Sequence, residues 1–262
     1  LKARDADENK ETKYKNFWKN NKGNLWKCAG GDLADVNANM GVENNVIIFD
    51  ANGKRTGFKW EQPTYDLKTN KDNLASAKAE LQGFITELNA ATTEAQIKAF
   101  YEKWFDIDFF LRTYAVNILC GMDDDYWGNA NNYYLYFDTG SAKATGKVYF
   151  IPFDYDNTLG ASISEGGFKQ NPLNWGRGKN RPLMDKLLSV PEYKSKFISI
   201  LKEVSSENGP WNFDKCSTLF LNWKNMVSPY LNSTDLSDQI TTKDWGDYGW
   251  QPGGYPLTSR SN

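Results

Sequence analysis

The chain has no histidine among its 262 residues. Without imidazole, histidine cannot activate a serine or cysteine nucleophile, and a zinc site cannot use histidine ligands. Chemistry in this chain must therefore come from Asp, Glu, Asn, Lys or Arg side chains. Among these, the carboxylates are suited to hard cations such as Mg²⁺ or Ca²⁺.

Cysteines, long apolar runs and net charge are also scarce. The three cysteines lack metal-type spacing, and an odd number cannot all pair within one chain. No apolar run approaches the roughly 20 residues of a membrane-spanning helix, so we expect no membrane span. The first residues lack the regions of a signal peptide, so an exported form would already be processed. The formal net charge of -2 gives no general attraction to nucleic acid, and we expect no such partner.

The chain is instead rich in core-forming residues, since 40% of it is hydrophobic and 15% aromatic. We expect one domain over 1–262, with a leading segment and a short hairpin in 1–60 and a mainly helical lobe in 61–262. Residues 1–24 are polar and lysine-rich, as in a helix or an arm. Apolar spacing predicts helices near 74–88, 93–104, 107–120, 182–188, 191–201 and 213–230, strands near 133–137 and 147–153, and a hairpin turning at Asn52-Gly53.

Acidic and amide side chains bracket the hairpin predicted from Tyr133 to Phe153. Asp123, Asp124 and Asp125 precede it, together with asparagines at 129, 131 and 132, and Asp154 and Asp156 follow it. A hairpin returns its two ends to within about 5 to 10 Å of each other. These groups could therefore share one metal ion.

The order of buried helix, acidic loop with a downstream Asn, hairpin and Asp is the order of the catalytic and metal-binding loops of protein kinases. The usual protein-kinase motifs are absent, because the chain has no His-Arg-Asp and no Asp-Phe-Gly. Upstream of Asp123 there is also no glycine-rich phosphate loop and no strand lysine of the usual kind.

Two long stretches resemble the CotH-like atypical protein kinases, a family related to the bacterial spore-coat protein CotH. They are FDIDFFLRTYAVNILCGMDDDYWGNANNYYLYFD over 105–138 and GKVYFIPFDYDNTLG over 146–160. A looser match begins at GNLWKCAGGDL over 23–33, and the Ser259-Arg260 ending is also similar. The resemblance implies an α+β, atypical protein-kinase-like fold, mainly the helical larger lobe, with a central hairpin carrying the acidic site. The smaller N-terminal lobe of the family is expected to be missing.

The same resemblance implies a metal-dependent enzyme that transfers phosphate from ATP to Ser or Thr hydroxyls of a secreted, cell-surface or spore-coat protein. Mg²⁺ is the expected metal, with Ca²⁺ or Mn²⁺ as alternatives. Two loops would do the chemistry, a catalytic loop over 121–132 and a metal loop over 154–160. The implied roles are Asp124 as catalytic residue, with Asp125 if the register differs, Asn132, Asp154 and Asp156 as metal ligands, and Asn157 and Lys27 as nucleotide contacts.

Other interpretations remain open from the residues alone. The run 123–125 by itself is typical of a solvated turn or a calcium site. FDYDNT also resembles the Asp-x-Asp-x-Thr motif of haloacid-dehalogenase-like phosphatases, which would require alternating strands and helices after it. Basic residues Lys27, Arg177 and Arg181 could contact phosphate or could be solvated surface charge. A non-catalytic adhesion module binding surface glycans is a further alternative, for which Trp175, Trp245 and Trp250 are candidates for exposure, whereas Trp104 and Trp223 are expected in the core.

Overall fold

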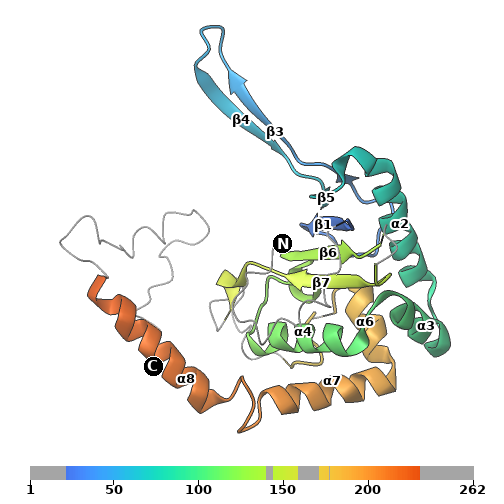
Figure 1. Ribbon diagram of the computed structural model, residues 1–262, viewed down its shortest axis with the longest axis vertical. Helices are drawn as coiled ribbons and strands as arrows, with labels where there is room; N and C mark the ends of the chain where they lie inside the picture. The colour runs from blue at the N-terminus through green and yellow to red at the C-terminus, as the bar shows by residue number, and fades with distance from the viewer. Residues whose placement is uncertain (1–21, 140–143, 159–170, 177, 231–262) are drawn as a thin grey trace. The chain divides into compact units, whose positions relative to one another are not determined.

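The computed structural model describes residues 22–139, 144–158, 171–176 and 178–230. The chain separates into two compact units, Leu1–Ile200 and Leu201–Asn262. Figure 1 shows the helices and strands. The described elements are a mixture of helices and strands, consistent with the predicted α+β class.

A five-stranded sheet in the order β2-β5-β1-β6-β7 is the centre of the first unit. The strands are β1 (Asn24–Cys28), β2 (Met40–Gly41), β5 (Tyr65–Leu67), β6 (Tyr133–Phe137) and β7 (Val148–Pro152). Only β2 and β5 pair in parallel. The predicted hairpin is β6 and β7, with Tyr133 opposite Pro152 and Leu135 opposite Phe150. The sequence patterns did not reveal β1, β2 or β5, which are short and lack a clear alternation.

Helices cover one face of this sheet (Figure 1). Aromatic rings fill the space between the layers, with Phe110 on Phe150 at 5.7 Å and Phe84 on Phe137 at 5.5 Å between centroids. Both pairs meet edge to face, as aromatic pairs prefer. The helices up to Val204 include η1 (Lys71–Asn73), α2 (Leu74–Ala90), α3 (Glu94–Trp104), α4 (Ile107–Leu119), α6 (Pro182–Ser189) and α7 (Pro191–Val204). All of these except η1, which was not predicted, lie within a few residues of the predicted ranges.

The predicted hairpin around Asn52-Gly53 is also present, as β3 (Asn44–Phe49) paired with β4 (Arg55–Glu61) in a sheet of its own. Gly53 has φ 77°, a left-handed conformation that glycine adopts without strain. Four consecutive apolar side chains of β3, Val46 to Phe49, are exposed.

The second unit contains α8 (Phe213–Val227) followed by η4 (Ser228–Tyr230). None of the side chains of α8, all of which the structure describes, is buried. The expectation that Trp223 belongs to the core is therefore wrong, since its side chain is 50% exposed. Helical spacing of apolar residues indicates an amphipathic face but does not say what covers that face.

Trp175 differs from its prediction in the opposite way, because it is buried. We expected it to be exposed, but it is 2% exposed, and its indole N–H donates to the Met122 carbonyl oxygen at 3.0 Å. Trp104 is half-buried. Trp245, Trp250 and Arg177 lie outside the described residues, as does the predicted arm up to residue 21.

Candidate active site

Two loops meet at the open end of the β6–β7 hairpin. The first, residues 121–132, joins α4 to β6 and contains the short helix α5 (Tyr126–Asn129). The second follows β7 and contains η2 (Tyr155–Asn157). The Phe153 N–H donates to the Asn132 carbonyl oxygen at 3.0 Å, and the Asp123 N–H donates to that of Asn157 at 3.4 Å. The two polar loops are therefore hydrogen-bonded neighbours, as the hairpin argument predicts.

Asparagine side chains hold the carboxylate of Asp124, which is 8% exposed. The Nδ2 atom of Asn129 donates to Oδ1 at 2.8 Å, and that of Asn132 donates to Oδ2 at 2.9 Å. Asn131 adds a longer contact of 3.3 Å to Oδ2. Hydrogen bonds to an ionised acceptor are stronger than those between neutral groups, so the orientation of this carboxylate is well defined.

Asp154 is an exposed carboxylate in a strained position next to this group. Its backbone is left-handed, with φ 63° and ψ 67°, which costs a residue other than glycine about 1–2 kcal/mol. Although the residue is exposed, partial desolvation of its carboxyl raises the pKa of Asp154, the charges of Asp156 and Asp124 raise it further, and Lys27 lowers it. The charges of Asp124 and Asp156 thus act on the Asp154 carboxylate at the meeting point of the loops.

Lys27 is brought to this site by β1, where it pairs with Tyr134 of β6. Its Nζ lies 5.4 Å from the centroid of the Phe153 ring, a cation–π arrangement. The charge of Lys27 also lowers the pKa of Asp154. The nucleotide contact implied for Lys27 stays a prediction.

Asp125 has different surroundings from its neighbour Asp124. It caps α5, is 1% exposed, and accepts hydrogen bonds from the Tyr114 hydroxyl at 2.8 Å and the Gly128 N–H at 2.7 Å. Burial raises the pKa of Asp125 to about 7, although Gly128, Tyr114 and Asn117 counteract it. Its carboxylate is thus enclosed by protein groups, while the carboxylate of Asp124 lies among the amides of the loop.

The oxygen atoms at this site suit a hard divalent cation. Because Asn132 donates through Nδ2, its Oδ1 remains as the acceptor of that amide. Asn157 likewise donates through Nδ2, to Asp156 Oδ1 at 2.8 Å. Among the described residues, no three Cys, Asp or Glu side chains form a group able to hold a metal. The predicted set of Asp154, Asp156 and Asn132 combines carboxylate and amide oxygens, a donor set that Mg²⁺ accepts.

Two residues of the site, Tyr114 and Asn117, were not predicted from the sequence, and both lie on α4. Arg181, predicted as a phosphate contact or a solvated surface charge, is 8% exposed, so it is not a solvated surface charge, and one of its Nη atoms lies 3.5 Å from the Gly128 carbonyl oxygen. Asn117 is a polar residue in a mainly apolar helix. A polar residue inside an otherwise apolar stretch was the available signal.

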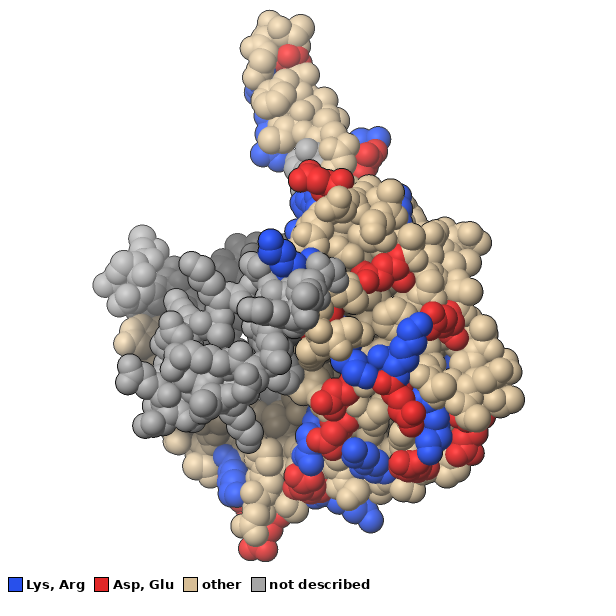
Figure 2. All heavy atoms as spheres, turned by 45° about the vertical axis from the view of Figure 1, so that its right-hand side comes forward, with Lys and Arg blue, Asp and Glu red and all other residues tan. Residues whose placement is uncertain are grey.

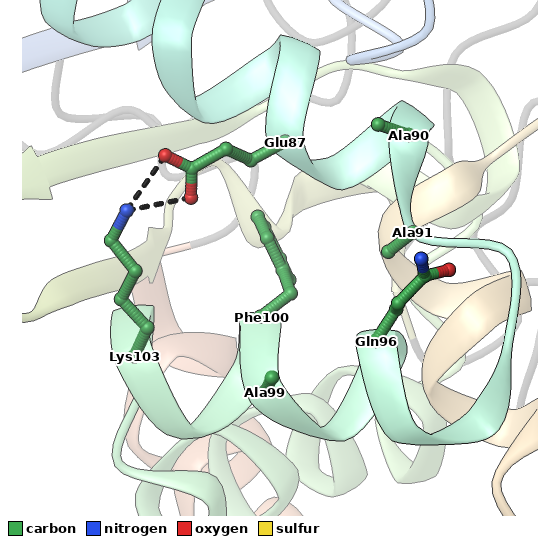
Figure 3. A pocket seen from close by; sticks show the side chains of 7 residues that line it. All are labelled: Glu87, Ala90, Ala91, Gln96, Ala99, Phe100 and Lys103. Carbon is green, nitrogen blue, oxygen red and sulfur yellow. Dashed lines mark hydrogen bonds and ion pairs between the residues drawn. The ribbon is translucent and has the colours of Figure 1, made fainter.

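A shallow pocket lies elsewhere, between the end of α2 and α3 (Figure 3). Alanines and Phe100 form its floor, and the ion pair of Lys103 with Glu87, at 2.6 Å, lies at one side. None of its lining residues belongs to the two loops, so it is separate from the candidate active site.

The structure thus defines a class of protein, an α+β domain whose antiparallel hairpin presents two loops with carboxylates and amides. The chain matches the family described as CotH kinase protein over residues 9–244, and it belongs to that family. Family membership suggests a kinase-like activity.

Two fungal proteins of Rhizopus delemar are among the similar sequences. Invasin CotH7 is 31% identical over 119 residues, which is 44% of this chain and 19% of that protein. Spore coat protein homolog 1 is 29% identical over 106 residues, which is 38% of this chain and 16% of that protein. The matched part is therefore less than a fifth of either relative. No solved structure matches the chain.

Proposed function

We propose that this chain transfers the γ-phosphate of ATP to a Ser or Thr hydroxyl of a secreted, cell-surface or spore-coat protein, with the help of a divalent metal ion. The observation that carries the proposal is the carboxylate of Asp124, oriented by neighbouring asparagines beside the exposed Asp154. Phosphoryl transfer needs this combination, a carboxylate to meet the attacking hydroxyl and another to hold the metal.

In this proposal Asp124 orients the hydroxyl and accepts its proton. The oxygen of that hydroxyl then forms a bond to the γ-phosphorus while the bond to the β-phosphate oxygen breaks, and ADP leaves. The side chains of Asn129 and Asn132 fix the direction from which Asp124 approaches. Such positioning is a large part of catalysis for this reaction class.

Asp154 and the Oδ1 atom of Asn132 would hold the metal, with Asp156 supporting. When bound, Mg²⁺ would neutralise charge on the phosphate oxygens. The positive charge of Lys27 is directed to the same place from β1, where it can interact with phosphate. Asn157 fixes Asp156 through its amide.

The relatives support the expected location. One is called an invasin and the other a spore coat protein homolog, so both names refer to surfaces. In the described residues no helix is both long and apolar enough to cross a bilayer.

The phosphatase alternative receives no support from the sheet. Its motif should follow a strand inside a parallel, alternating arrangement. Here Asp154 follows β7, which pairs antiparallel with β6 at the end of the strand order. A glycan-binding role loses one of its three candidate tryptophans, because Trp175 is buried.

A radiolabel assay tests the proposal. We expect the purified chain to incorporate label from γ-labelled ATP with Mg²⁺ into itself or a Ser/Thr-rich acceptor. Asp124→Asn and Asp154→Asn should each lower the rate by roughly 10²-fold or more. Asp72→Asn, a matched change at an exposed carboxylate in η1, should leave it unchanged.

Calorimetric titration of Mg²⁺ and ATP into the same variants separates binding from chemistry. We expect Asp124→Asn to retain metal-dependent nucleotide binding and Asp154→Asn to lose it. Absence of label transfer and of ATP binding in the unmodified chain would contradict the proposal.

A further inference from the structure

A polar network that joins buried residues of α4 to the two loops is unused by the chemistry proposed above. It begins at Asn117, which is fully buried in the middle of α4. The Tyr155 hydroxyl, from the loop that carries Asp154, donates to Asn117 Oδ1 at 2.7 Å. One turn of helix earlier, the fully buried Tyr114 reaches the other loop.

Tyr114 fixes the loop that carries Asp124 at two points. Its hydroxyl donates to Asp125 Oδ2 at 2.8 Å and accepts from the Trp127 N–H at 2.9 Å. The other oxygen of Asp125 accepts the Gly128 N–H, so the start of α5 is tied to α4 through one tyrosine. Asp124 directly precedes Asp125, the residue that Tyr114 holds.

Asn117 and Tyr114 lie about one helical turn apart on α4, and each holds one of the two loops. The amide nitrogen of Asn117 makes no hydrogen bond of ordinary length to any described group, so the two sets of hydrogen bonds meet only in the helix. The loop of Asp154 and the loop of Asp124 are therefore connected through α4 itself.

We propose that Tyr114 and Asn117 of α4, acting through Asp125 and Tyr155, are positioning residues that set the spacing between the Asp124 loop and the Asp154 loop. The inference rests on the proposed function for its catalytic meaning, but the coupling of the loops is a property of the fold alone.

Two physical arguments favour positioning over simple packing. Burying polar side chains in an apolar helix is costly, and the hydrogen bonds of the Tyr114 hydroxyl and of Asn117 Oδ1 offset only part of that cost, whereas apolar residues of similar size would pack without it. The loops also contain residues in left-handed conformations, Asn132 with φ 55° and Asp154 with φ 63°. Such backbones persist only where surrounding contacts hold them, and this network holds Tyr155 in one loop and Asp125 in the other.

Kinetics test the catalytic half of the inference. Tyr114→Phe removes only the hydroxyl, and we expect kcat to fall by roughly 10- to 100-fold with little change in the KM for ATP. Tyr65→Phe is the matched control, because Tyr65 is also fully buried and its hydroxyl accepts the Leu33 N–H at 2.9 Å. Equal loss of kcat in the two variants would mean that Tyr114 is only structural.

Hydrogen exchange tests the coupling without any activity. In metal-free protein without ATP, we expect Tyr155→Phe to speed amide exchange in residues 123–132 as well as in 153–158, and Tyr65→Phe to change neither. If Tyr155→Phe affects only its own loop, the network does not couple the loops and the inference is wrong. Lack of kinase activity in the unmodified chain would contradict the proposed function, but the hydrogen-exchange comparison would still test the coupling of the loops.

Discussion

Asp124 and Asp125 are adjacent, chemically identical and both buried, yet the fold gives them different hydrogen-bond partners. Asp124 receives side-chain amides of its own loop, whereas Asp125 faces the hydroxyl of Tyr114 and the backbone of α5. Because their side chains point to different partners, they should respond differently to substitution. Asp124 should control catalysis, and Asp125 should control stability and its dependence on pH.

The pH dependence of stability tests the environment of Asp125. Its pKa in the folded chain is about 7, above the usual value of about 3.9 for an unfolded Asp. Between those pH values the folded state holds a proton that the unfolded state has lost, so the free energy of unfolding should fall as pH rises, by at most about 1.4 kcal/mol per pH unit.

Asp125→Asn removes this titration. We expect the stability of the original chain relative to Asp125→Asn to decrease steadily from pH 4 to pH 7, as measured by urea denaturation at each pH. Tyr114, Asn117 and the Gly128 N–H face this carboxyl and favour its charged form, while Asp123 opposes it. If the free energies of unfolding of the original chain and of Asp125→Asn change in parallel with pH, Asp125 does not titrate in this range.

Among the elements, α5 depends most strongly on a single small residue. A Cβ atom on Gly128 would lie 2.1 Å from the Asp123 carbonyl oxygen, far inside the contact distance. The tight approach of these two residues is what allows the loop to close on itself within a few residues. Glycine is therefore required here by close approach of the backbone.

Gly128→Ala should consequently destabilise the chain by about 1–3 kcal/mol and displace the asparagines around Asp124. Gly83→Ala is the control, since Gly83 is an exposed position of α2 where an added Cβ meets nothing within 4 Å. That change should stabilise the chain by up to about 1 kcal/mol, because alanine is the better helix former. Thermal unfolding measures the stability of both variants. Equal destabilisation of the two would contradict the requirement for glycine at position 128.

At the scale of the whole molecule, the two units differ in how they bury apolar side chains. The aromatic core described above lies in the first unit, while α8 of the second buries no side chain. On the face in Figure 2, which includes the α2 and α3 side, Lys and Arg are interspersed with Asp and Glu. Exposed pairs such as Lys98 with Glu192, at 2.5 Å, contribute little stability individually.

Equal substitutions in the two units should therefore have unequal effects. Trp26 is fully buried in β1, and Trp26→Ala should lower the free energy of unfolding by about 3–5 kcal/mol. Trp223 is 50% exposed in α8, and Trp223→Ala should lower the free energy of unfolding by less than about 1 kcal/mol. Urea denaturation measures both, and a large loss for Trp223→Ala would mean that α8 is covered in solution.

The sequence by itself determined the longer helices, the two hairpins and the placing of acidic residues at the end of β6 and β7, but not the short helices η1, α5 and η2. These features depend on local periodicity, turn residues and strand pairing between neighbours in sequence, all of which are readable from the chain. The tertiary structure alone decided that β1 and β5 extend the hairpin into a sheet, that Lys27 reaches Asp154, and that Trp175 is buried while Trp223 is exposed. It also decided the different surroundings of Asp124 and Asp125, because a side chain's partners come from segments such as α4 whose contacts with the loop no local pattern encodes.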